Sequence, residues 1–419
     1  MAANAKKEIQ VYAHWLGLQE PSLMGVLSVS SAKGKESFSF EYADAWLKSG
    51  FSQMIDPDLQ LYPGAYYPRD DKPNFGVFLD SCPDRWGRVL MQRREAAIAK
   101  QESRAVKKLL ESDFLLGVFD EHRMGALRFK LEEDGPFLND NKKMAAPPWT
   151  SLRELEHASL KFEEDNTDDP EYLKWLSMLI ALGSSLGGAR PKASVTGADN
   201  NLWIAKFPSR NDDTDVAAWE MVANQLAINA GLNVAEGKLQ KFNNKYHTYL
   251  TKRFDRTGNN ARIHFASAMA LLGHVDGEEN AAGASYLELM EFISRHGAAV
   301  EKDLEELWRR IVFNICIKNT DDHLRNHGFL LTDKGWLLSP AYDINPNEYG
   351  KGLSINITDA DNSLDLDLAR GVAGYFRLKD EKAAQIIQEI STVVKDWKKI
   401  ASGHKISNAE QERMSAAFN

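Results

Sequence analysis

The order of strand-like and helix-like patterns along the chain limits its fold more than any other feature. Apolar and polar side chains alternate at residues 8–13, 24–30 and 34–42, and strand-like stretches return between residues 192 and 254. From about residue 265 the periodicity is mainly helical, apart from a predicted hairpin of residues 328–332 and 336–340. This order predicts an α+β protein with two lobes, an arrangement that can leave a cleft between them.

The length of the chain also indicates several parts. Its 419 residues exceed the roughly 250–300 that one hydrophobic core can serve. Residues 132–149 are rich in Gly, Pro, Asn and charge, which is typical of a boundary. We therefore expect an N-terminal subdomain at residues 1–145, a strand-rich lobe at 146–257 and a mainly helical lobe at 258–419.

Composition excludes some classes of function. The formal net charge of -9 argues against a bulk attraction to nucleic acid phosphate. Cys82 and Cys316 are too few and too far apart for a disulfide framework or a metal site, so we expect buried free thiols. The start of the chain has no apolar segment typical of a secretory signal, and "WLSMLIALG" is too short to span a membrane. We expect a cytoplasmic protein without membrane contact.

The stretch "NTDDHLRNHGFLL" at residues 319–331 has more charge and hydrogen-bonding capacity than a turn needs. Asn326 follows Asp321 by five residues, and Asp343 comes just after the predicted hairpin. A kinase catalytic loop has the same Asp-to-Asn spacing, followed by a hairpin and a second metal-binding Asp. This comparison predicts a phosphoryl-transfer site, with Asp321 near the substrate hydroxyl and Asn326 and Asp343 on Mg²⁺.

A structural interpretation of the same stretch is a helix end followed by a turn rich in Asn and Asp. The arrangement of Asp, Asn, hairpin and Asp argues against it. His323 can line the site or orient the loop, and a purely structural histidine is at least as plausible. Asp322, beside Asp321, can raise a pKa or add a metal contact.

A kinase also needs a phosphate-covering loop, a strand lysine and a helix glutamate. Gly187 and Gly188 belong to a glycine-rich turn, which alone is a weak signal. Lys206 lies in the apolar strand "LWIAKF", where its ammonium either finds a partner or reaches to water. Glu220, on the next predicted helix, is a candidate partner, although a solvent-facing glutamate is about as plausible.

The segment "TKRFDR" follows the last strand of the expected first lobe. Backbone groups of Lys252, Arg253 and Phe254 can meet an adenine edge there, and Phe254 can equally be a core residue. We include Lys252 and Phe254 among the candidate nucleotide-binding residues.

Together these segments resemble the HipA-type serine/threonine kinase toxins of bacterial toxin–antitoxin modules. The resemblance covers nearly the whole chain and rests on the segments "FLDSCPDRWGR", "DEHRMGALRF", "SSLGGARPKA", "IAKFPS", "TKRFDR", "NTDDHLRNHGFLL" and "LLSPAYDINP". It implies a two-lobed protein-kinase-like fold, with a β-rich N-terminal lobe, an extra N-terminal subdomain and a mainly helical C-terminal lobe.

The resemblance also implies roles. Asp321 would be the catalytic aspartate, Asn326 and Asp343 would hold Mg²⁺, and Lys206 would contact ATP. Residues 184–192 would form the phosphate loop, in which Ser185, with Ser184 beside it, would be autophosphorylated. The added charge would repel ATP and silence the kinase.

The same resemblance implies a protein substrate, an aminoacyl-tRNA synthetase being one known class. It also implies a helix-turn-helix antitoxin of the HipB kind, through which DNA is contacted indirectly. Two other functions stay open from the residues alone. One is a catalytically weak, antitoxin-binding co-regulator of an operator complex, and the other is a small-molecule kinase on the same scaffold.

Overall fold

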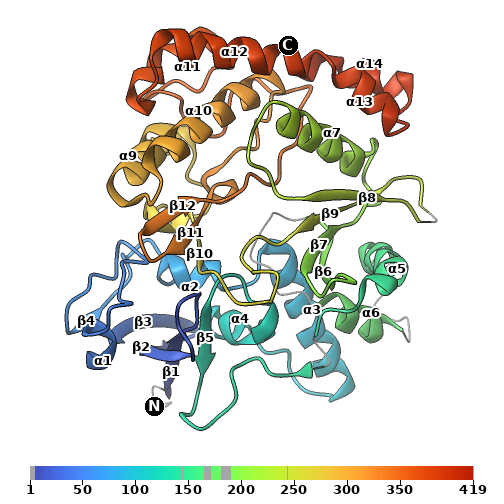
Figure 1. Ribbon diagram of the computed structural model, residues 1–419. Helices are drawn as coiled ribbons and strands as arrows, with labels where there is room; N and C mark the ends of the chain where they lie inside the picture. Colours follow the sequence, from blue (N-terminus) through green and yellow to red (C-terminus); the bar gives the residue numbers. More distant parts are fainter. Residues whose placement is uncertain (1–4, 143–144, 165–170, 181–189, 243, 419) are drawn as a thin grey trace. The chain divides into compact units, whose positions relative to one another are not determined.

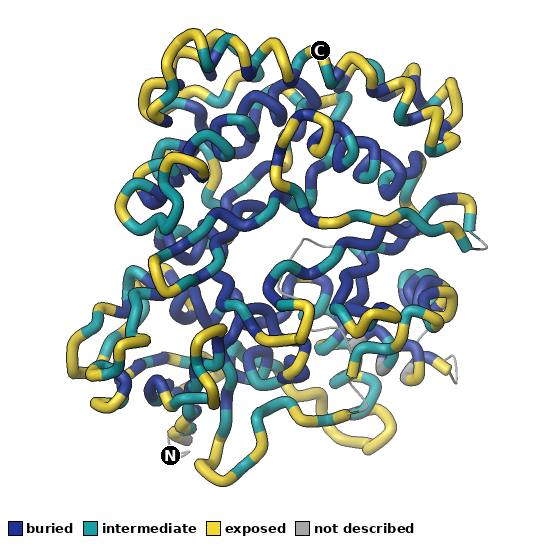
Figure 2. Tube along the Cα trace, in the orientation of Figure 1, coloured by how far each residue is buried: buried dark blue, intermediate teal, exposed yellow. Residues whose placement is uncertain are grey.

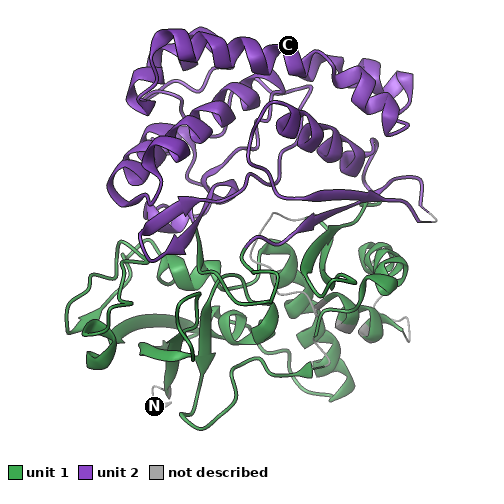
Figure 3. Ribbon diagram, in the orientation of Figure 1, with its two compact units in different colours: residues 1–210, 255–266 green, residues 211–254, 267–419 purple. Residues whose placement is uncertain are grey.

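The structure, a computed structural model (Figure 1), describes residues 5–142, 145–164, 171–180, 190–242 and 244–418. The chain forms two compact units, coloured separately in Figure 3. Unit 1 consists of residues 1–210 and 255–266, and unit 2 consists of residues 211–254 and 267–419. The expected α+β class is confirmed by the element order. The boundaries expected near residues 145 and 257 stay a prediction.

Unit 1 contains an antiparallel sheet in the order β4-β3-β2-β1-β5. Its strands are β1 (Ala5–Ala13), β2 (Ser22–Ala32), β3 (Lys35–Tyr42), β4 (Ala65–Tyr66) and β5 (Leu127–Lys130). The alternation seen in the sequence sets the face that is buried: Ile9 pairs with Leu27, which pairs with Phe40, and all three are fully buried. The three strands predicted at the start of the chain are therefore confirmed.

Outside this sheet, the described part of unit 1 contains the hairpin of β6 (Lys192–Thr196) and β7 (Leu202–Lys206) and several helices. Its helices are α1 (Asp44–Leu47), α2 (Gly76–Asp80), α3 (Arg85–Gln101), α4 (Glu111–Gly117), η1 (Asp120–His122), η3 (Trp149–Ser151), α5 (Leu152–Glu163) and α6 (Tyr172–Ile180). Helix α3 begins after Asp84, which caps it by accepting a hydrogen bond from the Gly87 N–H.

Unit 2 holds a second hairpin, β8 (Gly237–Gln240) and β9 (Thr248–Lys252), and the predicted hairpin β11 (Gly328–Thr332) and β12 (Gly335–Leu338). The short strand β10 (Phe265–Ser267) falls at the boundary of the units. The helices of unit 2 are α7 (Val216–Asn229), α8 (Ala268–Leu271), η4 (Asn280–Ala282), α9 (Tyr286–His296), α10 (Val300–Cys316), η5 (Leu324–Asn326), α11 (Leu366–Val372), η6 (Ala373–Phe376), α12 (Asp380–Val394), α13 (Trp397–Gly403), α14 (Asn408–Met414) and η7 (Ser415–Ala417).

Helix α10 is the core helix of unit 2. Leu304, Leu307, Trp308, Ile311 and Ile315 recur at helical spacing and are buried, and Figure 2 shows the helix largely buried. It packs against α9, α11 and α12. Since its carboxyl end leads directly into residues 319–326, this packed helix anchors the polar loop singled out in the sequence.

Cys82 and Cys316 are buried free thiols, as expected. Burial raises the pKa of Cys82 to about 12, so this thiol is not a reactive nucleophile. No helix within the described residues is both long and apolar enough to cross a membrane.

Candidate active site

The loop at residues 319–326 is built on a buried polar network. Asp322 is 4% exposed, and its Oδ2 accepts hydrogen bonds from the Tyr286 hydroxyl and from Asn314 Nδ2 at 2.6 Å. His327 Nε2 lies 3.1 Å from the same oxygen. Burial opposes ionisation of Asp322, but the histidine and these hydrogen bonds outweigh it, and the pKa of Asp322 is lowered. Asp322 therefore anchors the loop through buried hydrogen bonds and is not a candidate for direct catalysis.

Asp321 has the opposite environment, since its side chain is 83% exposed. Partial loss of hydration raises the pKa of Asp321, and the charges of Asp343 and Glu279 raise it further, while His323 opposes them. His323 Nε2 lies 4.0 Å from Asp321 Oδ1. The two adjacent aspartates therefore differ in role: the exposed Asp321 can meet a substrate, whereas the buried Asp322 supports the fold.

Asn326 is positioned by the loop itself. Its Nδ2 donates to the Asp321 carbonyl oxygen at 2.8 Å, and its backbone N–H donates to the His323 carbonyl oxygen, also at 2.8 Å. Its Oδ1 is buried and has no hydrogen-bond partner in the described part of the chain. A buried acceptor without a partner is costly, which suits an atom reserved for a cation or a ligand donor.

Two hydrogen bonds fasten the segment of Asp343 to this loop. The Tyr342 hydroxyl donates to the Arg325 carbonyl oxygen at 2.7 Å, and the Asn345 N–H donates to Asn319 Oδ1 at 3.2 Å. Asp343 thus lies between two anchored residues, close enough to Asp321 to raise its pKa. Its φ of +57° is uncommon for a residue other than glycine, and such conformations persist where the surroundings impose them.

Asn326 and Asp343 fit the requirements of Mg²⁺. This ion prefers oxygen ligands, takes one or two carboxylates from the protein and keeps several waters. Asn326 Oδ1 is an amide oxygen to which no described residue donates a hydrogen bond, and Asp343 supplies a carboxylate on the neighbouring segment. No three His, Cys, Asp or Glu side chains converge as a metal cluster among the residues that the structure describes. A Mg²⁺ site here would therefore depend on the amide oxygen.

Glu220 lies in the same unit and is 4% exposed, so the solvent-facing interpretation is wrong. Burial raises the pKa of Tyr249 well above its usual value, and the charges of Glu220 and Asp343 raise it further. Both carboxylates are therefore close to Tyr249. Lys206 is the last residue of β7 in unit 1, opposite Lys192 of β6, and is half-buried.

The stretch expected to form the phosphate loop, residues 184–192, reaches into a strand at its carboxyl end. Lys192 belongs to β6, and its Nζ donates to Asp84 Oδ2 at 2.8 Å in an ion pair whose side chains are 4% and 2% exposed. This lysine is therefore committed to the core of unit 1. Ser184, Ser185, Gly187 and Gly188 lie outside the described residues.

Two residues of the segment expected to meet adenine, Lys252 and Phe254, make contacts with other residues of unit 2. The Lys252 N–H donates to the Glu236 carbonyl oxygen at 2.9 Å, and its ammonium lies 3.9 Å from the Glu236 carboxylate. The half-buried Phe254 ring packs on Tyr342, with centroids 5.4 Å apart. Phe254 thus packs on the residue that precedes Asp343, and its adenine contact stays a prediction.

The sequence interpretation missed the residues beneath the loop. Nothing in the sequence links Tyr286, Asn314 and His327 to Asp322, because these residues come from α9, from α10 and from the position before β11. The available signal was Asn314, a polar residue inside the apolar helix stretch "IVFNICI", since buried amides require partners.

Comparisons with known proteins show the family of this chain. Residues 184–397, slightly more than half of the chain, match the model of the HipA-like C-terminal domain. The chain therefore belongs to the family of proteins that contain a HipA-like C-terminal domain.

Two curated relatives carry functional names. Toxin YjjJ of Escherichia coli is 25% identical over 199 residues, which cover 45% of this chain and 43% of that protein. A protein of Haemophilus influenzae named "Putative kinase" is 26% identical over 179 residues, covering 38% of this chain and 52% of that protein. The matched regions thus span about half the length of these relatives.

A solved structure shares the fold over nearly the whole chain. It is a chain of the Shewanella oneidensis complex of HipA, HipB and operator DNA, with a TM-score of 0.66 and 18% identity. The match covers 98% of this chain and 94% of that one. The expected two-lobed fold class is therefore confirmed.

Proposed function

We propose that this protein is an ATP- and Mg²⁺-dependent kinase whose transfer centre consists of Asp321, Asn326 and Asp343. One observation carries the proposal: the Tyr342 and Asn345 hydrogen bonds hold the segment of Asp343 against the loop that presents Asp321 and Asn326. Phosphoryl transfer depends mainly on such positioning and on charge neutralisation.

Each residue of the centre has a defined task in this proposal. Asp321, whose side chain is exposed, orients the attacking hydroxyl and accepts its proton, with His323 beside it. Asn326 and Asp343 would hold Mg²⁺, which when bound neutralises charge on the phosphates. Lys206, Glu220, Lys252 and Phe254, with Gly187 and Gly188, are the proposed nucleotide-binding residues.

We further propose a protein serine or threonine as the acceptor and a role as the toxin of a toxin–antitoxin module. Support comes from the name of the relative Toxin YjjJ and from the Shewanella complex with HipB and operator DNA. A helix-turn-helix antitoxin would then be the partner, and an aminoacyl-tRNA synthetase is one candidate substrate. Autophosphorylation of Ser185 or Ser184 would add charge that repels ATP.

Transfer of labelled phosphate tests the kinase assignment. Purified Asp321→Ala and Asp343→Ala are compared with the wild type in cell lysate with labelled ATP and Mg²⁺, and both are expected to lose transfer to protein. Asp333→Asn removes a carboxylate from the exposed turn of the β11–β12 hairpin and should retain full transfer. Full activity in both alanine variants would refute the assignment, and label found only in metabolites would favour a small-molecule kinase.

A further inference from the structure

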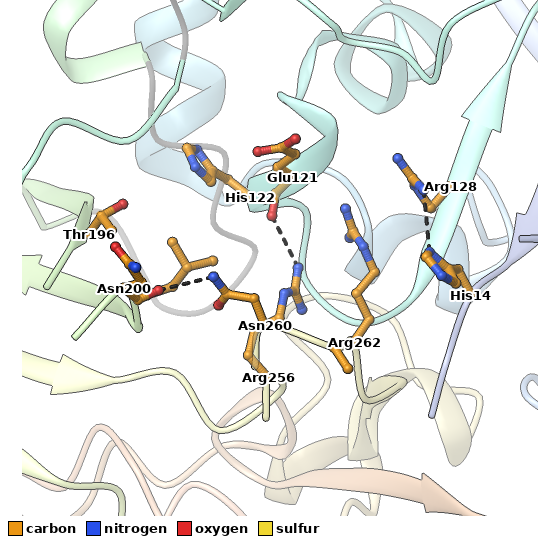
Figure 4. A pocket seen from close by; sticks show the side chains of 11 residues that line it. His14, Glu121, His122, Arg128, Thr196, Asn200, Arg256, Asn260 and Arg262 are labelled. Carbon is orange, nitrogen blue, oxygen red and sulfur yellow. Dashed lines mark hydrogen bonds between the residues drawn. The ribbon is translucent and has the colours of Figure 1, made fainter. Parts of the chain in front are cut away.

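A cavity of about 510 Å³ lies within unit 1 (Figure 4). Residues from the N-terminal sheet, η1, the β6–β7 hairpin and the segment 255–266 line it. Its volume falls in the range of small-molecule sites, roughly 300–1,000 Å³. None of the proposed kinase residues lines this cavity, so its interpretation is independent of the proposed function.

Arg262 lines this cavity and is one of its buried cationic residues. Its side chain is 8% exposed, and its Nη2 donates to the Asp120 carbonyl oxygen at 2.7 Å. Its Nη1 is buried and has no hydrogen-bond partner among the residues that the structure describes. Burial lowers the pKa of Arg262 to about 10, so it remains charged at neutral pH. A buried charged donor without an acceptor indicates a place for an anion.

Asp120, which does not itself line the cavity, binds the side chains of two lining residues, Arg128 and Arg262. Arg128 donates to Asp120 Oδ2 through Nε at 2.9 Å and Nη2 at 2.5 Å, and Arg262 Nη2 lies 3.3 Å from the same oxygen. Arg128 Nη1 lies 3.3 Å from His14 Nδ1. Burial and the arginine charges lower the pKa of His14, so the neutral ring can accept this hydrogen bond. Both guanidiniums are therefore pre-oriented.

The other side of the cavity is less charged. Asn260 Nδ2 donates to the Asn200 carbonyl oxygen at 3.0 Å, which joins the segment 255–266 to the turn of the β6–β7 hairpin. Leu202 and Ala261 add apolar surface. Of the charged lining residues, three are arginines, the third being Arg256, and Glu121 is the acidic one. The cavity thus combines a cationic end with an amide and apolar end.

We propose that this cavity binds a small organic anion whose phosphate or carboxylate group is received by Arg262 and Arg128. The uncharged body of the ligand packs against Leu202 and the paired asparagines. The planar guanidinium fork suits both anionic groups, so the probes must distinguish them.

Calorimetric titration of the full chain without Mg²⁺ tests this proposal, with glycerol 3-phosphate as the phosphate probe and citrate as the carboxylate probe. The half-buried Thr196 lines the cavity at the end of β6. Thr196→Glu and Thr196→Gln add side chains of nearly equal size that differ by one charge. We expect at least one probe to bind the wild type, and to bind Thr196→Glu about tenfold more weakly than Thr196→Gln because of like-charge repulsion.

A second variant adds a negative charge elsewhere in the cavity, and a control variant makes the same change in net charge at a residue that does not line it. Asn260→Asp adds a charge at the exposed rim with almost no change in size and should also weaken binding. Arg104→Gln makes the same change in net charge at the exposed ion pair with Glu95 and should leave the affinity unchanged. Thermal unfolding confirms that each variant is folded. No binding of either probe, equal affinity in Thr196→Glu and Thr196→Gln, or equal weakening by Arg104→Gln would overturn the proposal.

Discussion

Adjacent residues in the catalytic loop serve different purposes. Asp321 is exposed and has a raised pKa, whereas Asp322 is buried among Tyr286, Asn314 and His327 and has a lowered pKa. The second carboxylate is thus an anchor for the loop, and its charge contributes to the raised pKa of Asp321, as expected for adjacent carboxylates. Its burial among hydrogen-bond donors does not support a metal contact.

Replacing Asp322 by Asn should destabilise the protein at neutral pH. Hydrogen bonds to a charged group contribute roughly 1.5–3 kcal/mol each, and the amide keeps only part of this. Because folding lowers the pKa of Asp322 below its ordinary 3.8, its contribution is present above that pH and disappears as pH falls through the folded value. Urea unfolding at several pH values should show a difference between wild type and Asp322→Asn that shrinks in acid. A constant difference would contradict the linkage.

Asp343 allows backbone strain to be separated from chemistry. A left-handed conformation costs an ordinary L-residue roughly 1–2 kcal/mol, and glycine escapes that cost. We expect Asp343→Gly to be more stable than Asp343→Ala by about 1 kcal/mol, while both lose phosphate transfer. Thermal unfolding and the labelled-ATP assay measure the two effects. Transfer retained by the glycine variant would show that the carboxylate is dispensable.

At the scale of elements, Asp84 both caps helix α3 and forms an ion pair with Lys192 of strand β6. Asp84 accepts from the Gly87 N–H at 2.8 Å through Oδ1 and from Lys192 through Oδ2. The pair is almost fully buried, so it couples the start of a helix to the start of a strand.

Asp84→Asn should remove the ion pair and retain the cap, since asparagine caps as well as aspartate. Leaving one buried charge without its partner costs about 3–5 kcal/mol. We expect a lower urea midpoint for Asp84→Asn, with partial recovery in the double variant Asp84→Asn/Lys192→Met, measured by circular dichroism. A single-variant loss below about 1 kcal/mol, the range of exposed pairs, would show that the pair is hydrated.

Elements with a local signal were predictable from the sequence. The strands of residues 8–13 and 34–42 follow a period of two, and the β11–β12 hairpin follows the turn at Asp333-Lys334-Gly335. The five-residue spacing of Asp321 and Asn326 is likewise local. The contact of Asp84 with Lys192 spans 108 residues and follows no period, so no pattern in the sequence could indicate it.

At the scale of the whole molecule, the unpredicted feature is the return of residues 255–266 to unit 1. The boundary expected at residue 257 falls inside this segment. Asp255 Oδ2 accepts from the Gly125 N–H at 2.8 Å, and Arg256 Nη2 donates to the Arg123 carbonyl oxygen at 2.8 Å. These buried contacts pair side chains of the returning segment with backbone groups more than a hundred residues earlier, so they become visible only in three dimensions.

Unit 1 should therefore depend on its second segment for folding. Without residues 255–266, the N–H of Gly125 and the carbonyl oxygens of Arg123 and Asp120 lose their charged partners. We expect the fragment 1–210 to show a poorly dispersed amide NMR spectrum. The same fragment joined to residues 255–266 through a glycine–serine linker of roughly 20 residues should show a dispersed one. Replacing Asp255 by Ala in the joined fragment is the matched control and should lower its thermal stability. Equal dispersion and stability with and without residues 255–266 would mean that unit 1 is complete at residue 210, and that the returning segment only covers a finished core.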